Sequence, residues 1–149
     1  MRRLFLLIAL ICVLHTESAS ACSCITSNEA VKGFDFNQWL AHLDGAMFTG
    51  RVLNIEKVDE RFEDGGVMQR LKVTFGIERY WKGVERRQAI IYTGLGGGDC
   101  GVPYAVGEKF FVIAYTRNGK LATDICTAPG KYNEVKYYEK QLGKGIRPK

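Results

Sequence analysis

Hydrophobic and polar residues alternate most strictly in the middle of the chain, between Leu71 and Glu78. Side chains point to opposite faces of a strand in turn, so a period of two predicts a strand with one buried face. The segment Ala46–Val58 is rich in Val, Ile and Phe and predicts a second strand. Between them, Asp59–Gly66 is charged and ends in two glycines, which predicts a turn and therefore a hairpin.

Three further strands are expected after this hairpin. They are Gln88–Thr93, Lys109–Tyr115 and Lys120–Cys126. The sequence Arg117-Asn118-Gly119 joins the last two and is typical of a tight turn.

Hydrophobic residues follow a helical period at two places outside these strands. Phe36, Trp39, Leu40 and Leu43 are spaced i, i+3, i+4, i+7, with Asp35 as the expected N-cap. Val135, Tyr138 and Leu142 fall on one helical face, and Gly143 follows as a stop signal. A short helix is therefore expected before the strands and another after them.

Five strands in consecutive order with flanking short helices predict a mainly β fold, a small five-stranded antiparallel barrel. Closure of the barrel removes the exposed edges that an open sheet of this size would present. The length of 149 residues allows one domain of this kind. Hydrophobic residues make up 46% and charged residues 25%, the balance of a soluble globular protein.

The first 21 residues have the features of a secretory signal peptide. Arg2 and Arg3 precede the apolar run Leu4–Leu14, and the sequence Ala19-Ser20-Ala21 provides a cleavage site. The run of about 11 residues is short against the roughly 20 that span a bilayer. We expect residues 22–149 to be secreted, with no membrane span. A membrane anchor remains the alternative, as does a bacterial lipoprotein that is acylated on Cys22 and held at the membrane or in the periplasm.

Removal of residues 1–21 changes the cysteine inventory. Four of the five cysteines remain, which are Cys22, Cys24, Cys100 and Cys126. In an oxidising compartment they predict two disulfides, for which three pairings are possible. The formal charge of +5 is a diffuse excess and does not indicate a nucleic-acid partner.

Several catalytic chemistries lack the residues they need. After residue 21 the only serines are Ser23 and Ser27 and the only histidine is His42, so neither a Ser–His–Asp triad nor a zinc site of the chain's own is expected. The glycine-rich segment Gly94–Gly98 lacks the Gly-Lys-Ser/Thr ending of a phosphate-binding loop. We therefore predict no enzymatic activity and no cofactor.

Two clusters of charged residues are expected to form solvated surface and not binding sites. Glu60, Glu63 and Asp64 fall in the predicted hairpin turn, where a solvated charge cluster is expected. The C-terminal part is basic and offers a solvated helix face or, as the alternative, a site for a polyanion. Its cations are Lys131, Lys136, Lys140, Lys144, Arg147 and Lys149.

The order of several short motifs resembles that of the tissue inhibitors of metalloproteinases and, more broadly, the netrin-like domain. These motifs are Cys22-Ser23-Cys24, a helix, Phe48-x-Gly50-x-Val52, Tyr80-Trp81-Lys82-Gly83, Cys100-Gly101 and Cys126. The resemblance covers nearly all of residues 22–149 and implies an OB-type barrel. This chain departs from the family in having no cysteines for a third disulfide and no cysteine-rich C-terminal subdomain.

The resemblance implies a disulfide pairing of Cys22–Cys100 and Cys24–Cys126. It also implies an inhibitory site in which the α-amine and carbonyl of Cys22 chelate the catalytic zinc of a metalloendopeptidase. Ser23 would enter the specificity pocket of the protease, and Ile25 and Thr26 would continue along its substrate groove. The remaining contacts implied are Cys24, Gly97, Gly98, Asp99 and Cys100.

A zinc metalloendopeptidase is thus the expected partner of a monomeric inhibitor. The alternative is a non-inhibitory netrin-like module that binds a protein or a polyanion outside the cell.

Overall fold

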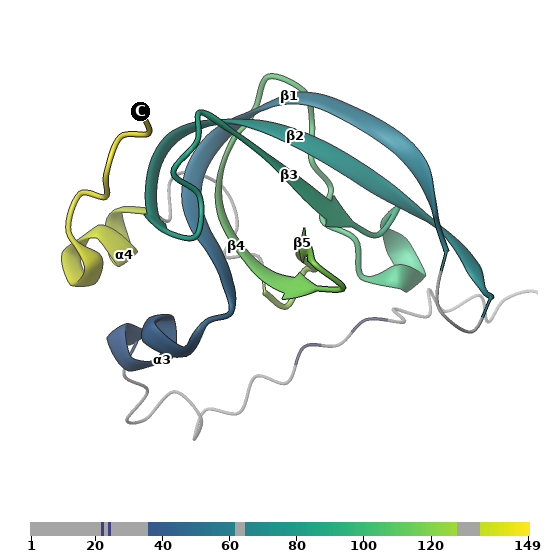
Figure 1. Ribbon diagram of the computed structural model, residues 1–149, viewed down its shortest axis with the longest axis horizontal. Coiled ribbons are helices and arrows are strands. Elements are labelled where there is room, and N and C mark those ends of the chain that lie inside the picture. The colour runs from purple at the N-terminus through teal and green to yellow at the C-terminus, as the bar shows by residue number, and fades with distance from the viewer. Residues whose placement is uncertain (1–21, 23, 25–35, 62–64, 128–134) are drawn as a thin grey trace, which may run out of the picture.

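The computed structural model describes residues 22, 24, 36–61, 65–127 and 135–149. The fold is mainly β, with a five-stranded mixed sheet and two short α-helices (Figure 1). In chain order the elements are α3 (Phe36–His42), β1 (Gly45–Arg61), β2 (Val67–Lys82), β3 (Gln88–Thr93), the 3₁₀ helix η1 (Gly97–Asp99), β4 (Lys109–Arg117), β5 (Lys120–Ala122) and α4 (Val135–Leu142).

All five expected strands and both expected helices are present, and the differences concern their lengths. The first hairpin is longer than predicted, because β1 and β2 remain paired as far as Arg61 and Val67. The last strand is shorter, since β5 ends at Ala122 and a turn centred on Asp124 follows it. The second hairpin turn is confirmed: Asn118 and Gly119 both have positive φ, as tight hairpin turns require.

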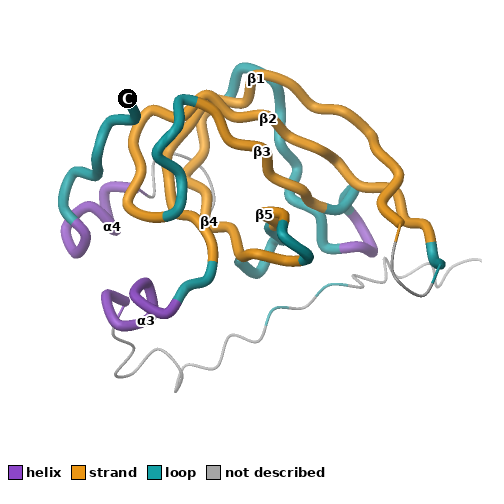
Figure 2. Tube along the Cα trace, in the orientation of Figure 1, coloured by secondary structure: helices purple, strands orange, loops and turns teal. Residues whose placement is uncertain are grey.

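The strands pair in the closed order β1-β2-β3-β5-β4, with β4 returning to β1 (Figure 2). The prediction of consecutive order and of antiparallel pairing throughout is therefore wrong at one place. β3 pairs with β5 in parallel, through Tyr92 and Ala122. The cause is β1, whose first half occupies one edge of β4 from Gly45 to Arg51 and leaves only the other edge for β5.

Two hydrophobic clusters pack on the two sides of this sheet. The larger one fills its interior and includes an edge-to-face pair of Phe48 and Phe75 with ring centroids 5.4 Å apart. The smaller one lies under the helices and contains Met47, Phe111, Ile113 and Val135. Leu40 and Leu43, predicted from their spacing to be apolar contacts, pack against it together with Leu142.

The helices are held at their C-terminal ends by residues of β2. Lys82 donates from Nζ to the carbonyl oxygens of Leu40 and Ala41, at 2.7 and 2.8 Å, and so satisfies groups that a helix end leaves unpaired. Trp81 donates from Nε1 to the carbonyl of Gly143 at 2.9 Å. Gly143 has a φ of 73°, which confirms it as the stop of α4.

The residues after α4 are also attached to β2. Tyr80 and Ile146 exchange two backbone hydrogen bonds of 2.9 and 2.8 Å. Arg79 donates to the carbonyl oxygen of Lys144 at 3.1 Å. The C-terminal end therefore lies along the edge of β2 beside α4 (Figure 1).

Some sequence-based expectations fall outside the described residues. These include the signal peptide over residues 1–21 and the N-cap at Asp35. No helix in the described part of the chain is long and apolar enough to cross a membrane.

Candidate functional site

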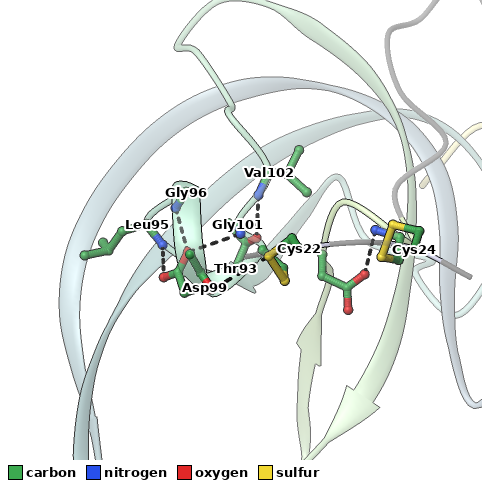
Figure 3. The surroundings of a disulfide bond; sticks show 12 residues. Cys22, Cys24, Thr93, Leu95, Gly96, Asp99, Gly101 and Val102 are labelled. Carbon is green, nitrogen blue, oxygen red and sulfur yellow. Dashed lines mark hydrogen bonds between the residues drawn. A yellow bond between two sulfur atoms is a disulfide. The ribbon is translucent and has the colours of Figure 1, made fainter. Parts of the chain in front are cut away.

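Two disulfides attach the N-terminal cysteines to the loops that follow η1 and β5. Cys22 is bonded to Cys100 and Cys24 to Cys126, across sequence separations of 78 and 102 residues (Figure 3). This is the pairing that the resemblance implies. The two partner segments are themselves joined, because the backbone amide of Ile125 donates to the carbonyl of Cys100 at 3.0 Å.

Asp99 organises the loop that carries Cys100. Its carboxylate accepts backbone hydrogen bonds from Leu95 (2.5 Å), Gly96 (2.8 Å) and Gly101 (3.2 Å), as Figure 3 shows. The loop has no room for a side chain at Gly94, where a Cβ would come within 2.5 Å of the Asp99 carboxylate. Cys100 itself has a φ of 59°, which is uncommon for a residue with a side chain. The loop is thus built around one carboxylate.

The protonation of Asp99 follows from these contacts. Burial raises the pKa of its carboxyl, but the three backbone amides and the positive charge of Arg70 outweigh burial. The pKa is consequently held below its ordinary value of 3.8. Asp99 is therefore ionised at neutral pH, and its oxygens face the loop's own amides.

Asp124 has the equivalent role beside Cys126. One of its oxygens accepts from the backbone amides of Cys126 (2.9 Å) and Thr127 (2.8 Å). The other accepts from the hydroxyl of Tyr115 at 3.3 Å. Burial, together with the charge of Asp124, raises the pKa of Tyr115, which keeps this hydroxyl protonated as a donor.

Of the residues predicted to contact a protease, the structure places Cys22, Cys24 and Cys100 at the two disulfides and Gly97–Asp99 in η1. The carbonyl oxygen of Gly98 lies 3.7 Å from the sulfur of Cys22, so η1 adjoins the first disulfide. Ser23, Ile25 and Thr26 lie outside the described residues.

The sequence prediction for Glu60 is wrong. It was expected in a solvated turn, but it lies within β1 with its side chain only 13% exposed. Glu63 and Asp64 lie outside the described residues. The roles of Asp99 and Asp124 were also missed, although an Asp one or two residues before a cysteine is a signal that could have suggested them.

No protein-family model and no curated protein matches the chain.

The hydrogen bonds of Asp99 are expected to contribute to the free energy of unfolding. Replacement of Asp99 by Asn removes a charged acceptor from three amides, and we expect the free energy of unfolding at pH 7 to fall by about 1 kcal/mol, a low value because the site is partly exposed. Since the folded pKa is lowered, ionised Asp99 stabilises the fold above about pH 4, its ordinary range, and this contribution is lost as the pH falls through the lowered value. Urea unfolding at pH 7 and at pH 2 should show the difference between parent and variant shrinking in acid. An equal difference at both pH values would contradict this role.

Proposed function

We propose that residues 22–149 form a secreted inhibitor of zinc metalloendopeptidases, related to the tissue inhibitors of metalloproteinases. The observation that carries the proposal is the attachment of Cys22 to Cys100 beside η1. If the signal peptide is removed after Ala21, the α-amine of Cys22 becomes the chain terminus. A terminal amine is then fixed at one end of a small β fold.

The strand order supports an OB-type barrel of the netrin-like kind. An OB fold is a five-stranded Greek-key barrel, and a Greek key brings strands together out of chain order. The closed order β1-β2-β3-β5-β4 has this property, because β5 lies between β3 and β4. The correction to the predicted strand order thus favours the proposed fold.

The chemistry proposed for Cys22 uses only its backbone. A catalytic zinc in a protease keeps one position open for water. The α-amine and carbonyl oxygen of Cys22 would chelate the zinc, displacing the water and raising the coordination number to five, while the sulfur stays in the disulfide. An α-amine has a pKa of about 7.7–8.0, so a neutral fraction exists near pH 7 and the metal displaces the proton from the remainder.

The two disulfides would lower the entropic cost of this binding. Ordering a free backbone costs about 1–2 kcal/mol per residue, and a segment fixed before binding avoids that cost. Cys22 and Cys24 are both anchored, to segments whose own loops are held by Asp99 and Asp124. Ser23, between them, would enter the protease's specificity pocket. The inhibitor would have no enzymatic activity and would act as a monomer.

The experiment that tests the proposal combines N-terminal mass spectrometry with inhibition assays. The secreted protein should begin at Cys22 with a free amine, and it should inhibit at least one member of a panel of zinc endopeptidases. Serine endopeptidases, which have no metal to chelate, form the matched control. An acylated or uncleaved N-terminus, or no inhibition across the panel, would contradict the proposal.

Exposed lysines favour a second candidate, a module that binds an extracellular polyanion. Lys136, Lys140 and Lys144 are all exposed on and just after α4. We expect their combined replacement by Glu to abolish retention on a heparin column, because binding to a polyanion depends on charge. Inhibition of a zinc endopeptidase should stay within about twofold of the parent. Loss of inhibition in this variant would show that the protease binds at α4 and not at the disulfide-bonded end, which would contradict the proposed inhibitory site.

A further inference from the structure

A cavity of about 230 Å³ opens beside the Cys22–Cys100 disulfide. Cys100 and Asp99 form part of its wall, and charged residues from β1, β2, β4 and β5 form much of the rest. Pockets for drug-sized ligands have volumes of roughly 300–1,000 Å³, so this one suits a smaller molecule, of about the size of a single sugar.

The carboxylates around this cavity have their oxygens paired within the protein. Both oxygens of Asp99 accept backbone amides, and both oxygens of Asp124 accept hydrogen bonds. Glu60 contacts Lys120 through one oxygen, at 3.3 Å, and Arg70 through the other, at 3.5 Å. Three negative charges therefore line the cavity, but both oxygens of each carboxylate already face a hydrogen-bond donor or a cation of the protein.

The cations differ from the carboxylates in this respect. The side chain of Arg70 is only 15% exposed, and its Nε is buried without a hydrogen-bond partner. A guanidinium has five N–H donors, and in the described part of the chain Arg70 makes an ion pair with Glu60 and no side-chain hydrogen bond. Lys120 also lies over the ring of Tyr92, with Nζ 5.0 Å from the ring centroid. With Arg117 of β4, which also lines the cavity, three cations face the three carboxylates, so the formal charges balance, but hydrogen-bond donors are in excess.

We propose that this cavity binds a phosphate or sulfate group carried by a small molecule, between Arg70 of β2 and Lys120 of β5. A guanidinium presents parallel donors to two oxygens of such a group, and an ammonium approaches a third from another direction. A carboxylate has only two oxygens and would match these donors less completely. The Tyr92 ring provides an apolar wall for the rest of the ligand. Binding in this cavity does not require the proposed protease inhibition, although Asp99 and Cys100 border both sites.

Glu60 allows a specific test of this proposal, because its removal should strengthen binding of the anion. Its carboxylate lies between Arg70 and Lys120 and competes with the incoming anion for both. Replacement of Glu60 by Gln should therefore strengthen binding at least threefold, while Arg70→Gln and Lys120→Gln should each weaken it at least tenfold. Lys57→Gln removes the same charge from an exposed position of β1 outside the cavity, and we expect it to change binding less than twofold.

The test is isothermal titration of the disulfide-bonded protein with glucose 6-phosphate, glucose 6-sulfate, inorganic phosphate and glucose at constant ionic strength. Saturable binding of a sugar ester, tighter than that of inorganic phosphate and absent for glucose, is the expected result. Lys120→Gln keeps the test valid if Arg70→Gln does not fold. The proposal fails if neither ester binds saturably, if inorganic phosphate binds more tightly than both, or if Lys57→Gln weakens binding as much as the cavity variants do.

Discussion

Addition of one alanine in front of Cys22 should lower inhibition of a zinc endopeptidase at least a hundredfold, a loss of about 2.7 kcal/mol in binding free energy. The extension converts the α-amine of Cys22 into an amide nitrogen, which is a poor zinc ligand, and it places a methyl group toward the metal. The fold and both disulfides should persist, because the change lies outside both hydrophobic clusters. Inhibition constants for parent and extended protein, with matching thermal unfolding curves, provide the measurement.

Ser23→Gly is the matched control for the alanine extension. It keeps the terminal amine and removes only the side chain proposed to enter the specificity pocket, so its effect should be smaller and should differ between proteases. Equal inhibition by the extended and parent proteins would show that the N-terminal mechanism is wrong.

Removal of the second disulfide should produce the largest loss of stability. The Cys24→Ser/Cys126→Ser variant opens a loop with a sequence separation of 102 residues. In the chain-entropy model a loop of this length stabilises by up to about 4–5 kcal/mol, which is a large fraction of the stability of a small domain. Guanidinium unfolding at equilibrium measures the fall in the free energy of unfolding, and its slope should rise, because the unfolded chain without this cross-link is less compact.

The same variant also tests the proposed inhibition, because it leaves Cys22–Cys100 and the terminal amine intact. We expect weaker inhibition, since the segment between the two cysteines is then anchored at one end only. A stability within about 1 kcal/mol of the parent would contradict the role of this bond as a cross-link of the unfolded chain.

Local patterns in the sequence were enough to predict most of the secondary structure. The strict alternation after Leu71 identified β2, and the helical spacing of Leu40 and Leu43 identified both α3 and the face that it buries. These signals depend on neighbours within one turn or one pleat. The position of β5 does not depend on such neighbours, because its pairing with β3 involves Tyr92 and Ala122, which are far apart in sequence.

The candidate site was predictable only in part, for a similar reason. A resemblance implied which cysteines pair, whereas residue spacing alone left three pairings open. The hydrogen bonds of Asp99 depend on a loop conformation with a glycine at position 94 and an uncommon φ at Cys100, which no periodicity encodes. The burial of Glu60 depends on Arg70 and Lys120, which reach it from two other strands.

The attachment of the C-terminal end to β2 determines where anything joined to this protein would project. Ile146 is paired with Tyr80, and Lys144 is held by Arg79, so a segment fused after Lys149 would start beside α4. Figure 1 shows α4 on the left and the short helical turn of η1 on the right, with the strands between them. A fluorescent label, an affinity tag or a tether to a solid support at Lys149 would therefore leave the disulfide-bonded end facing away from the attachment point.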